Sequence, residues 1–273
     1  MHLSLPLIQV ELERSPSSPR YTFLRNSQSG DRLPSFDLLA DSLPTAVHKV
    51  ADFVADIAFT QEYEVLSIAV HGPAIATRLR RGDNTILSYD HVPAFWIKTW
   101  PEVAQEWIDR PRRFGWPPAS VIDEIRRRGV LLVAACQAHS TDPHNEWRLS
   151  FSVGERVLID SLSSVQRLVY LYAKMVWMSS LKSKSFLASY HLKTALLWLC
   201  EERPTQFWRG DNLVVCVGDI FRWLRQEIAA GNLRHYFIST DNMIPKWVES
   251  TGALIQSLDD IIDNMFQVRQ RTQ

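Results

Sequence analysis

The sequence has neither an excess of charge nor a long apolar run. Thirty Lys and Arg residues balance thirty Asp and Glu residues, so no net field draws the chain to nucleic acid or to a membrane surface. Such binding would need a local patch. The longest apolar stretches, VLLVAAC and TALLWLC, are far shorter than the roughly 18 to 20 residues that cross a bilayer, so we expect no membrane partner.

Cysteine is also scarce. Cys136, Cys200 and Cys216 lie within apolar runs, are odd in number and show no C-x-x-C spacing. A disulfide framework or a structural zinc site needs paired or clustered thiols. We therefore expect no disulfide and no zinc, and a cytoplasmic or nuclear location. The opening MHLSLPLIQVELERSP has no basic start and no small-residue cleavage site, so it does not predict a signal peptide.

Apolar residues are abundant, at 46% of the chain, which is enough for one large core or two smaller ones. Up to about residue 155 the alternation is mainly that of strands, interrupted by one amphipathic helix near residues 40–59. Beyond that point apolar residues recur every three and four positions. We predict a mixed α/β fold of the α+β class, with a sheet lobe over residues 1–155 and a helical lobe over residues 156–273. The helices of that lobe are expected at residues 155–180, 189–202, 211–230 and 248–268.

The segment SYHLKTALLWLCEERP, residues 189–204, joins an apolar helix to a polar first turn. At about 100° per residue, the apolar side chains leave little of the circumference polar, so most of this helix must be buried. A helix N-terminus presents unpaired N–H groups and a partial positive charge. A capping Ser189 beside Tyr190 and a Lys would suit a phosphate and a base. The alternative is a capped core helix that binds no ligand.

Two strand-like segments carry polar side chains on one face. In SYDHVPAF, Asp90 shares a face with Ser88, where a bare carboxylate would be costly without a cation or a partner. In WRLSFS, Arg148, Ser150 and Ser152 form a polar row that faces a cleft, while the apolar residues between them pack.

Five stretches, taken together with their order and spacing, point to one family. They are VHGPAIATRL (70–79), SYDHVPAFW (88–96), EWRLSFSVGER (146–156), ASYHLKTALLWLCEERP (188–204) and LRHYFISTDNMI (233–244). The sequence resembles the Mab-twenty-one-like family, which includes cyclic GMP-AMP synthase and the animal cGAS-like receptors of the nucleotidyltransferase superfamily. The resemblance covers roughly residues 60–245 and both predicted lobes.

The resemblance implies a nucleotidyltransferase-fold sheet lobe with three carboxylates for Mg²⁺ or Mn²⁺, and a helical lobe that closes over a nucleoside triphosphate. It assigns the third carboxylate, which is a catalytic residue and a metal ligand, to Asp90. It assigns base contacts to Arg148 and Ser150, phosphate contacts to Lys174 and Ser189, and base stacking to Tyr190. Against these stand simpler roles: Asp90 paired with a nearby Arg, Tyr190 filling the lobe interface, and Lys174 exposed to solvent.

The sequence departs from the family pattern at the other two carboxylates. Active members carry a Gly-Ser turn, followed on a strand by two acidic residues that are separated by one position. No Gly-Ser dipeptide precedes residue 60, and Asp37 and Asp41 have the wrong spacing. One carboxylate cannot hold two Mg²⁺ ions against their hydration, so we expect the chain as written to be inactive in nucleotidyl transfer. The sequence is then either an incomplete gene model or a natural short form.

Two other functions stay open. One is a non-enzymatic interaction module, either a scaffold that binds a protein partner or an RNA-binding surface, in which the same residues serve packing or partner contacts. The other is a double-stranded RNA sensor, which requires a set of basic side chains to share one face: Arg78, Arg80, Arg81, Arg126, Arg127 and Arg128. The region between Glu155 and Ser189 lacks the His and Cys cluster of a zinc-bearing insertion, so DNA sensing is not expected.

Overall fold

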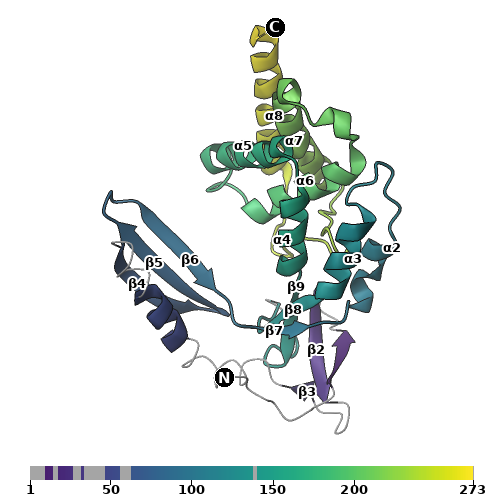
Figure 1. The fold of residues 1–273 in the computed structure, drawn as a ribbon. Coiled ribbons are helices and arrows are strands. Elements are labelled where there is room, and N and C mark those ends of the chain that lie inside the picture. The colour runs from purple at the N-terminus through teal and green to yellow at the C-terminus, as the bar shows by residue number, and fades with distance from the viewer. Residues whose placement is uncertain are drawn as a thin grey trace. The chain divides into compact units, whose positions relative to one another are not determined.

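The computed structural model describes residues 10–14, 18–26, 32–33, 47–55, 63–137 and 140–272. The chain divides into two compact units. The sheet unit comprises Met1–Ile97 and Val130–Ser150, and the helical unit comprises Lys98–Gly129 and Phe151–Gln273. The first unit contains antiparallel sheets and the second is built from helices (Figure 1), so the predicted α+β class is confirmed.

The larger sheet of the sheet unit has the strand order β1-β2-β9-β8-β7, and β3 pairs with β2. Neighbouring strands in this sheet run antiparallel. The sheet therefore joins strands from both ends of the unit, since β9 pairs with β2 as well as with β8. The bounds are β1 (Val10–Arg14), β2 (Tyr21–Asn26), β3 (Arg32–Leu33), β7 (Ala94–Ile97), β8 (Val130–Val133) and β9 (Glu146–Ser150).

The smaller sheet is an antiparallel meander of β4 (Tyr63–His71), β5 (Ala74–Arg81) and β6 (Ile86–His91) (Figure 1). Gly72 begins the short connection from β4 to β5, and its φ of +55° is a conformation that glycine adopts at little cost. Of the helix expected near residues 40–59, the described part, residues 47–55, is helical. It packs on this sheet, because the ring of Phe53 lies 6.1 Å from that of His91, edge to face.

The strand-like segment SYDHVPAF is divided between the two sheets. β6 ends at His91, and β7 begins at Ala94 in the other sheet. Pro93 lies at the break, where it has no N–H to give to a strand ladder and restricts the backbone of Val92. Asp90 therefore lies one residue from the end of its strand.

Strand β9 has the alternation that its sequence predicts. Trp147 and Leu149 are buried, whereas Arg148 and Ser150 are half-buried. The prediction is wrong for Ser152, which begins helix α4 instead of extending the polar row. The backbone leaves the extended region at Phe151, where φ is −93° and ψ is 18°, so the strand cannot continue.

The helical unit holds most of the helices of the chain, and their bounds follow the predicted periodicity closely. The segment expected as one helix over residues 155–180 is two helices, because Ser163 caps the second one. Its Oγ accepts from the Gln166 N–H at 3.2 Å, and Gln166 Oε1 accepts from the Ser163 N–H at 2.8 Å. The bounds are α2 (Gln105–Asp109), α3 (Ala119–Arg128), α4 (Ser152–Ser161), α5 (Ser164–Ser180), α6 (Ser189–Glu202), α7 (Leu213–Ala229) and α8 (Gly252–Thr272).

Helix α6 is buried over most of its length, as its sequence predicts. From Leu192 to Glu201, Lys193 alone is not buried. A helix that is apolar on nearly every side must have neighbours all round it, and α5 and α7 both pack against α6. Among the described helices, none combines the length and apolar character that a bilayer crossing requires.

A buried ionic cluster closes the C-terminal end of α6. Glu201 lies 3.4 Å from Arg110 and 3.6 Å from Arg112, measured between side-chain oxygen and nitrogen atoms. The Tyr236 hydroxyl donates to Glu201 Oε1 at 2.6 Å, and burial raises the pKa of Tyr236 well above its ordinary value. The Pro-rich and basic segment PRRFGWPP, residues 111–118, is therefore a structured loop that this cluster anchors.

Replacing Glu201 tests how much this cluster stabilises the helical unit. In Glu201→Gln, Arg112 keeps its buried charge and loses its carboxylate partner, so the free energy of unfolding should fall by about 3 kcal/mol. The matched control is Glu124→Gln, which breaks an exposed pair with Arg128 and should change stability by less than about 1 kcal/mol. Urea unfolding measures both. Equal stability of the two variants would contradict a structural role for the buried cluster.

A second ionic cluster joins β1, β2 and β3. Glu13 accepts from Arg32 and from Arg25, each at 2.8 Å, and Arg32 also donates to Asp142 at 2.8 Å. The hydrogen bond from Arg32, with that from Arg25, lowers the pKa of Glu13 from 4.5 to about 2. A carboxylate with a lowered pKa stabilises the fold above its unfolded pKa, and this contribution is lost as the pH falls through the folded pKa.

The contribution of Glu13 should therefore disappear between about pH 4.5 and pH 2. We expect Glu13→Gln to be less stable than the unmodified chain at pH 7, and the difference to shrink as the pH falls across that window. Urea unfolding of both proteins at several pH values gives the difference directly and cancels the titration of other carboxylates. A difference that stays constant down to pH 2 would contradict the assignment.

Candidate functional site

The polar first turn of α6 begins with a cap that differs from the expected one. Ala188 occupies the N-cap position and Ser189 is the first helical residue, so the prediction of a capping Ser189 is wrong. The return contact comes from His191, whose Nδ1 accepts from the Ala188 N–H at 2.8 Å. With Ala188 extended, at φ −112° and ψ 166°, the chain enters the helix one residue earlier than the sequence suggested.

Tyr190 is held by its hydroxyl group. Its Oη lies 2.7 Å from Nε2 of His235, which is 2% exposed and follows α7 in the chain. The two rings are tilted by 30° with their centres 6.0 Å apart. The ring of Tyr190 is itself half-buried, so its polar tip is fixed inside the helical unit while part of the ring stays accessible.

Two charged side chains adjoin Tyr190. The Lys193 ammonium lies over the Tyr190 ring, 5.2 Å from its centre, and forms an ion pair with Glu155 of α4. The Tyr170 hydroxyl of α5 donates to the Ser189 carbonyl oxygen at 3.4 Å. Burial, together with the negative charge of Glu155, raises the pKa of Tyr170. One site thus combines an aromatic ring, a cation and the N-terminus of a helix.

Lys174 lies on the side of α5 that faces this turn. It is half-buried and lies one helical turn after Tyr170 and three residues before Trp177, so the three side chains share a face of α5. Tyr170 contacts the first residue of α6, Ser189, and the Trp177 indole N–H donates to the Leu187 carbonyl oxygen just before α6, at 2.9 Å. Three of the predicted residues, Lys174, Ser189 and Tyr190, are therefore brought to one region of the helical unit.

The other predicted residues belong to the sheet unit. Asp90 is exposed on β6, opposite Ala76 of β5. Arg148 and Ser150 lie on β9, which belongs to the other sheet. Asp90 is thus not a neighbour of these two residues in any strand ladder.

The described residues contain no cluster of metal ligands. Within the described parts of the chain, no three His, Cys, Asp or Glu side chains are grouped so that they could hold a metal ion. Asp90 is exposed and belongs to no such group, and Asp37 and Asp41 lie outside the described residues. The described residues therefore do not fit a pair of Mg²⁺ or Mn²⁺ ions, which require several converging oxygen ligands.

Three of the six arginines named for RNA binding are paired with acids. Arg80 contacts Glu64 at 3.1 Å, Arg81 contacts Asp83, and Arg128 contacts Glu124 at 2.6 Å. Strand alternation puts Arg78 and Arg80 on one face of β5 and Arg81 on the other. These carboxylates offset the charge of three arginines locally, and the strand separates Arg80 from Arg81. Binding of RNA by the six arginines stays a prediction from the sequence.

The sequence analysis pointed to Lys193, the Lys of SYHLK, but missed Tyr170, Glu155 and His235. Lys193 had a local signal, since it lies three residues after Tyr190 and shares its side of the helix. The other three residues come from α4, α5 and the segment after α7. Their sequences carry no mark of where those elements meet, so no local pattern indicated them.

Antiparallel sheets followed by a helical C-terminal part are consistent with a nucleotidyltransferase domain that precedes a helical domain, and comparison with known proteins agrees. The model of the Mab-21 protein nucleotidyltransferase domain matches residues 37–161, and that of the Mab-21 protein HhH/H2TH-like domain matches residues 166–260. The chain therefore belongs to the Mab-21 family, as the five stretches of sequence predicted.

Individual relatives also point to the Mab-21 family. Protein mab-21-like 3 of Danio rerio is 32% identical over 154 residues, which cover 53% of this chain and 36% of the relative. The protein of the same name from Xenopus laevis is 25% identical over 211 residues, 72% of this chain and 51% of the relative. A cyclic GMP-AMP synthase-like receptor of Aethina tumida is 25% identical over 200 residues, 71% of this chain and 46% of the relative. The chain thus spans between about a third and a half of the length of these relatives.

Proposed function

We propose that the helical unit binds a nucleoside triphosphate at the N-terminal end of α6. The observation that carries the proposal is the half-buried Tyr190 ring, which is anchored by its hydroxyl and lies beside the Lys193 ammonium. An aromatic ring that is held in place and partly accessible is a platform on which any base can stack. The family likeness to a cyclic GMP-AMP synthase-like receptor supports a nucleotide as the ligand.

The triphosphate has its own contacts in this proposal. The first N–H groups of α6 carry a partial positive charge, and Ser189 supplies a hydroxyl group at that end of the helix. Lys174 and Lys193 add two positive charges. Lys193 already pairs with Glu155, so a bound phosphate would compete with this carboxylate for the ammonium group. Lys174 should therefore attract the phosphate more strongly than Lys193 does.

The proposal is limited to binding. Transfer of a nucleotidyl group by the family mechanism requires converging carboxylates that hold metal ions, and Asp90 is the one carboxylate that the family pattern assigns in this chain. The roles of Asp90 as a ligand of Mg²⁺ or Mn²⁺, and of Arg148 and Ser150 as base contacts, stay predictions from the family resemblance. We derive no catalytic step from them.

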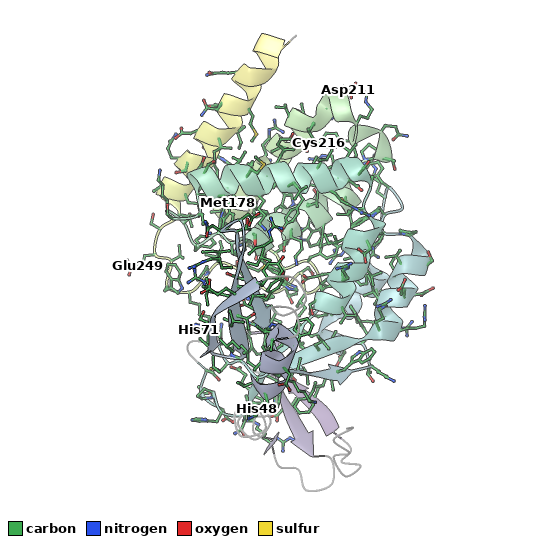
Figure 2. The ribbon with its side chains drawn as sticks, turned by 60° about the vertical axis from the view of Figure 1, so that its left-hand side comes forward. His48, His71, Met178, Asp211, Cys216 and Glu249 are labelled. Atoms are coloured by element: carbon green, nitrogen blue, oxygen red, sulfur yellow. The ribbon has the colours of Figure 1, made fainter. Side chains whose placement is uncertain are left out.

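The alternative function, a non-enzymatic interaction module, has one observation in its favour. Large apolar side chains line the outer side of α5 and are 44% to 63% exposed: Leu168, Leu171, Tyr172, Met175 and Met178. Met178, labelled in Figure 2, lies near the C-terminal end of that helix. A groove of about 560 Å³ adjoins this stripe between α5, α7 and α8. Exposed apolar stripes of this kind are typical of surfaces that bind a partner protein.

Calorimetric titration separates the two functions. We expect the 273-residue chain to bind ATP or GTP, and Tyr190→Ala to weaken binding by about 5- to 150-fold, the effect of losing one base stack. The matched control is Tyr172→Ala, which removes an exposed tyrosine of α5 and should leave the affinity unchanged. Binding should also weaken with added salt, because phosphate contacts are screened.

Circular dichroism confirms that each variant is folded. Negligible binding by all three folded proteins, with and without Mg²⁺, would contradict the proposed pocket and make the interaction module the leading function. Equal losses in Tyr190→Ala and Tyr172→Ala would also contradict it, since the effect would then not belong to the stacking position.

A further inference from the structure

His235 is almost fully buried and contacts Tyr190 from inside the helical unit. Its Nδ1 atom accepts two backbone hydrogen bonds, from the Phe237 N–H at 3.2 Å and from the Ile238 N–H at 3.1 Å. Its Nε2 atom lies 2.7 Å from the Tyr190 hydroxyl. The imidazole thus bridges the segment after α7 and the first turn of α6.

These contacts fix the position of the imidazole proton. An atom that accepts two N–H groups must present its lone pair, so Nδ1 carries no hydrogen. The neutral ring therefore carries its hydrogen on Nε2, because the hydrogen bonds that Nδ1 accepts select this tautomer. Nε2–H therefore donates to the Tyr190 hydroxyl oxygen, and the direction of this hydrogen bond is determined by the backbone of Phe237 and Ile238.

The surroundings also hold the imidazole ring in its plane. His235 lies 5.8 Å from the ring of Phe151 and 6.4 Å from that of Phe237. With two backbone donors on one nitrogen and aromatic rings beside it, the imidazole has one permitted orientation. The Tyr190 ring is tied to this fixed point at its hydroxyl and to α6 at its Cα atom, which restricts the rotation of the ring.

We propose that His235 is a positioning residue that holds the Tyr190 ring in the orientation required to stack on a nucleobase. This inference rests on the proposed nucleotide binding and assigns part of its affinity to a residue that does not touch the ligand. A ring that is already fixed loses less conformational freedom when a base stacks on it, so binding is tighter.

Two substitutions of His235 separate its contacts. In His235→Gln the side-chain amide reaches the place of Nε2 and still donates to Tyr190. In His235→Asn the shorter side chain keeps an acceptor near the place of Nδ1 for the two backbone N–H groups, but its amide cannot reach Tyr190. Tyr190→Phe removes the hydroxyl and leaves the stacking ring.

We expect His235→Gln to bind ATP or GTP within about twofold of the unmodified chain, and His235→Asn and Tyr190→Phe to bind about three- to tenfold more weakly, as for the loss of one orienting hydrogen bond. The double variant His235→Asn with Tyr190→Phe should be no weaker than either single variant, because both remove the same bond. Nitrogen-15 NMR of the histidine rings should report the Nε2–H form of His235 in the unmodified chain.

The outcomes are distinguishable from those of the proposed function. If Tyr190→Ala loses binding while His235→Asn and Tyr190→Phe keep full affinity, the stacking site stands and the positioning role of His235 is overturned. Additive losses in the double variant, or the Nδ1–H form in the NMR spectrum, would also overturn it. If the unmodified chain binds no nucleotide, both proposals fail together.

Discussion

Helix α6 is buried over most of its length, and this burial constrains the rest of the helical unit. The helix cannot rotate or slide without exposing leucine and tryptophan side chains to water, a cost of about 1.5 to 3 kcal/mol for each large side chain. Its ends are therefore fixed in space. At one end Glu201 holds the arginines of a loop that is distant in sequence, and at the other end Tyr190 and Lys193 form the polar turn. The candidate site is positioned by the packing of the helix that carries it.

Much of the fold could be predicted because it depends on local pattern. The apolar circumference of α6 and the alternation of Trp147 and Leu149 in β9 are both readable from short windows, and both are confirmed. The break before β7 was missed although Pro93 marks it, because apolar residues continue on both sides. The cap of α6 was misplaced by one residue, a shift smaller than local patterns resolve.

The candidate site was predictable only in part, for a different physical reason. Tyr190 and His235 are separated by 45 residues, and Lys193 and Glu155 by 38. Such contacts depend on how helices pack, and no short window of sequence records that packing. The family resemblance supplied Lys174, Ser189 and Tyr190 as candidates, but not the partners that hold Tyr190 and Lys193 in position.

Neither unit is a continuous piece of chain. Residues 98–129 belong with the helices that follow residue 150, while the strands at residues 130–150 return to the sheet that began far earlier. During synthesis, the larger sheet can therefore form only after β9 has been translated. The buried arginines at the PRRFGWPP loop can pair with Glu201 only after α6 has been translated. No single cut between Ile97 and Phe151 leaves both units whole, so expressing either one alone would require a spliced or permuted gene.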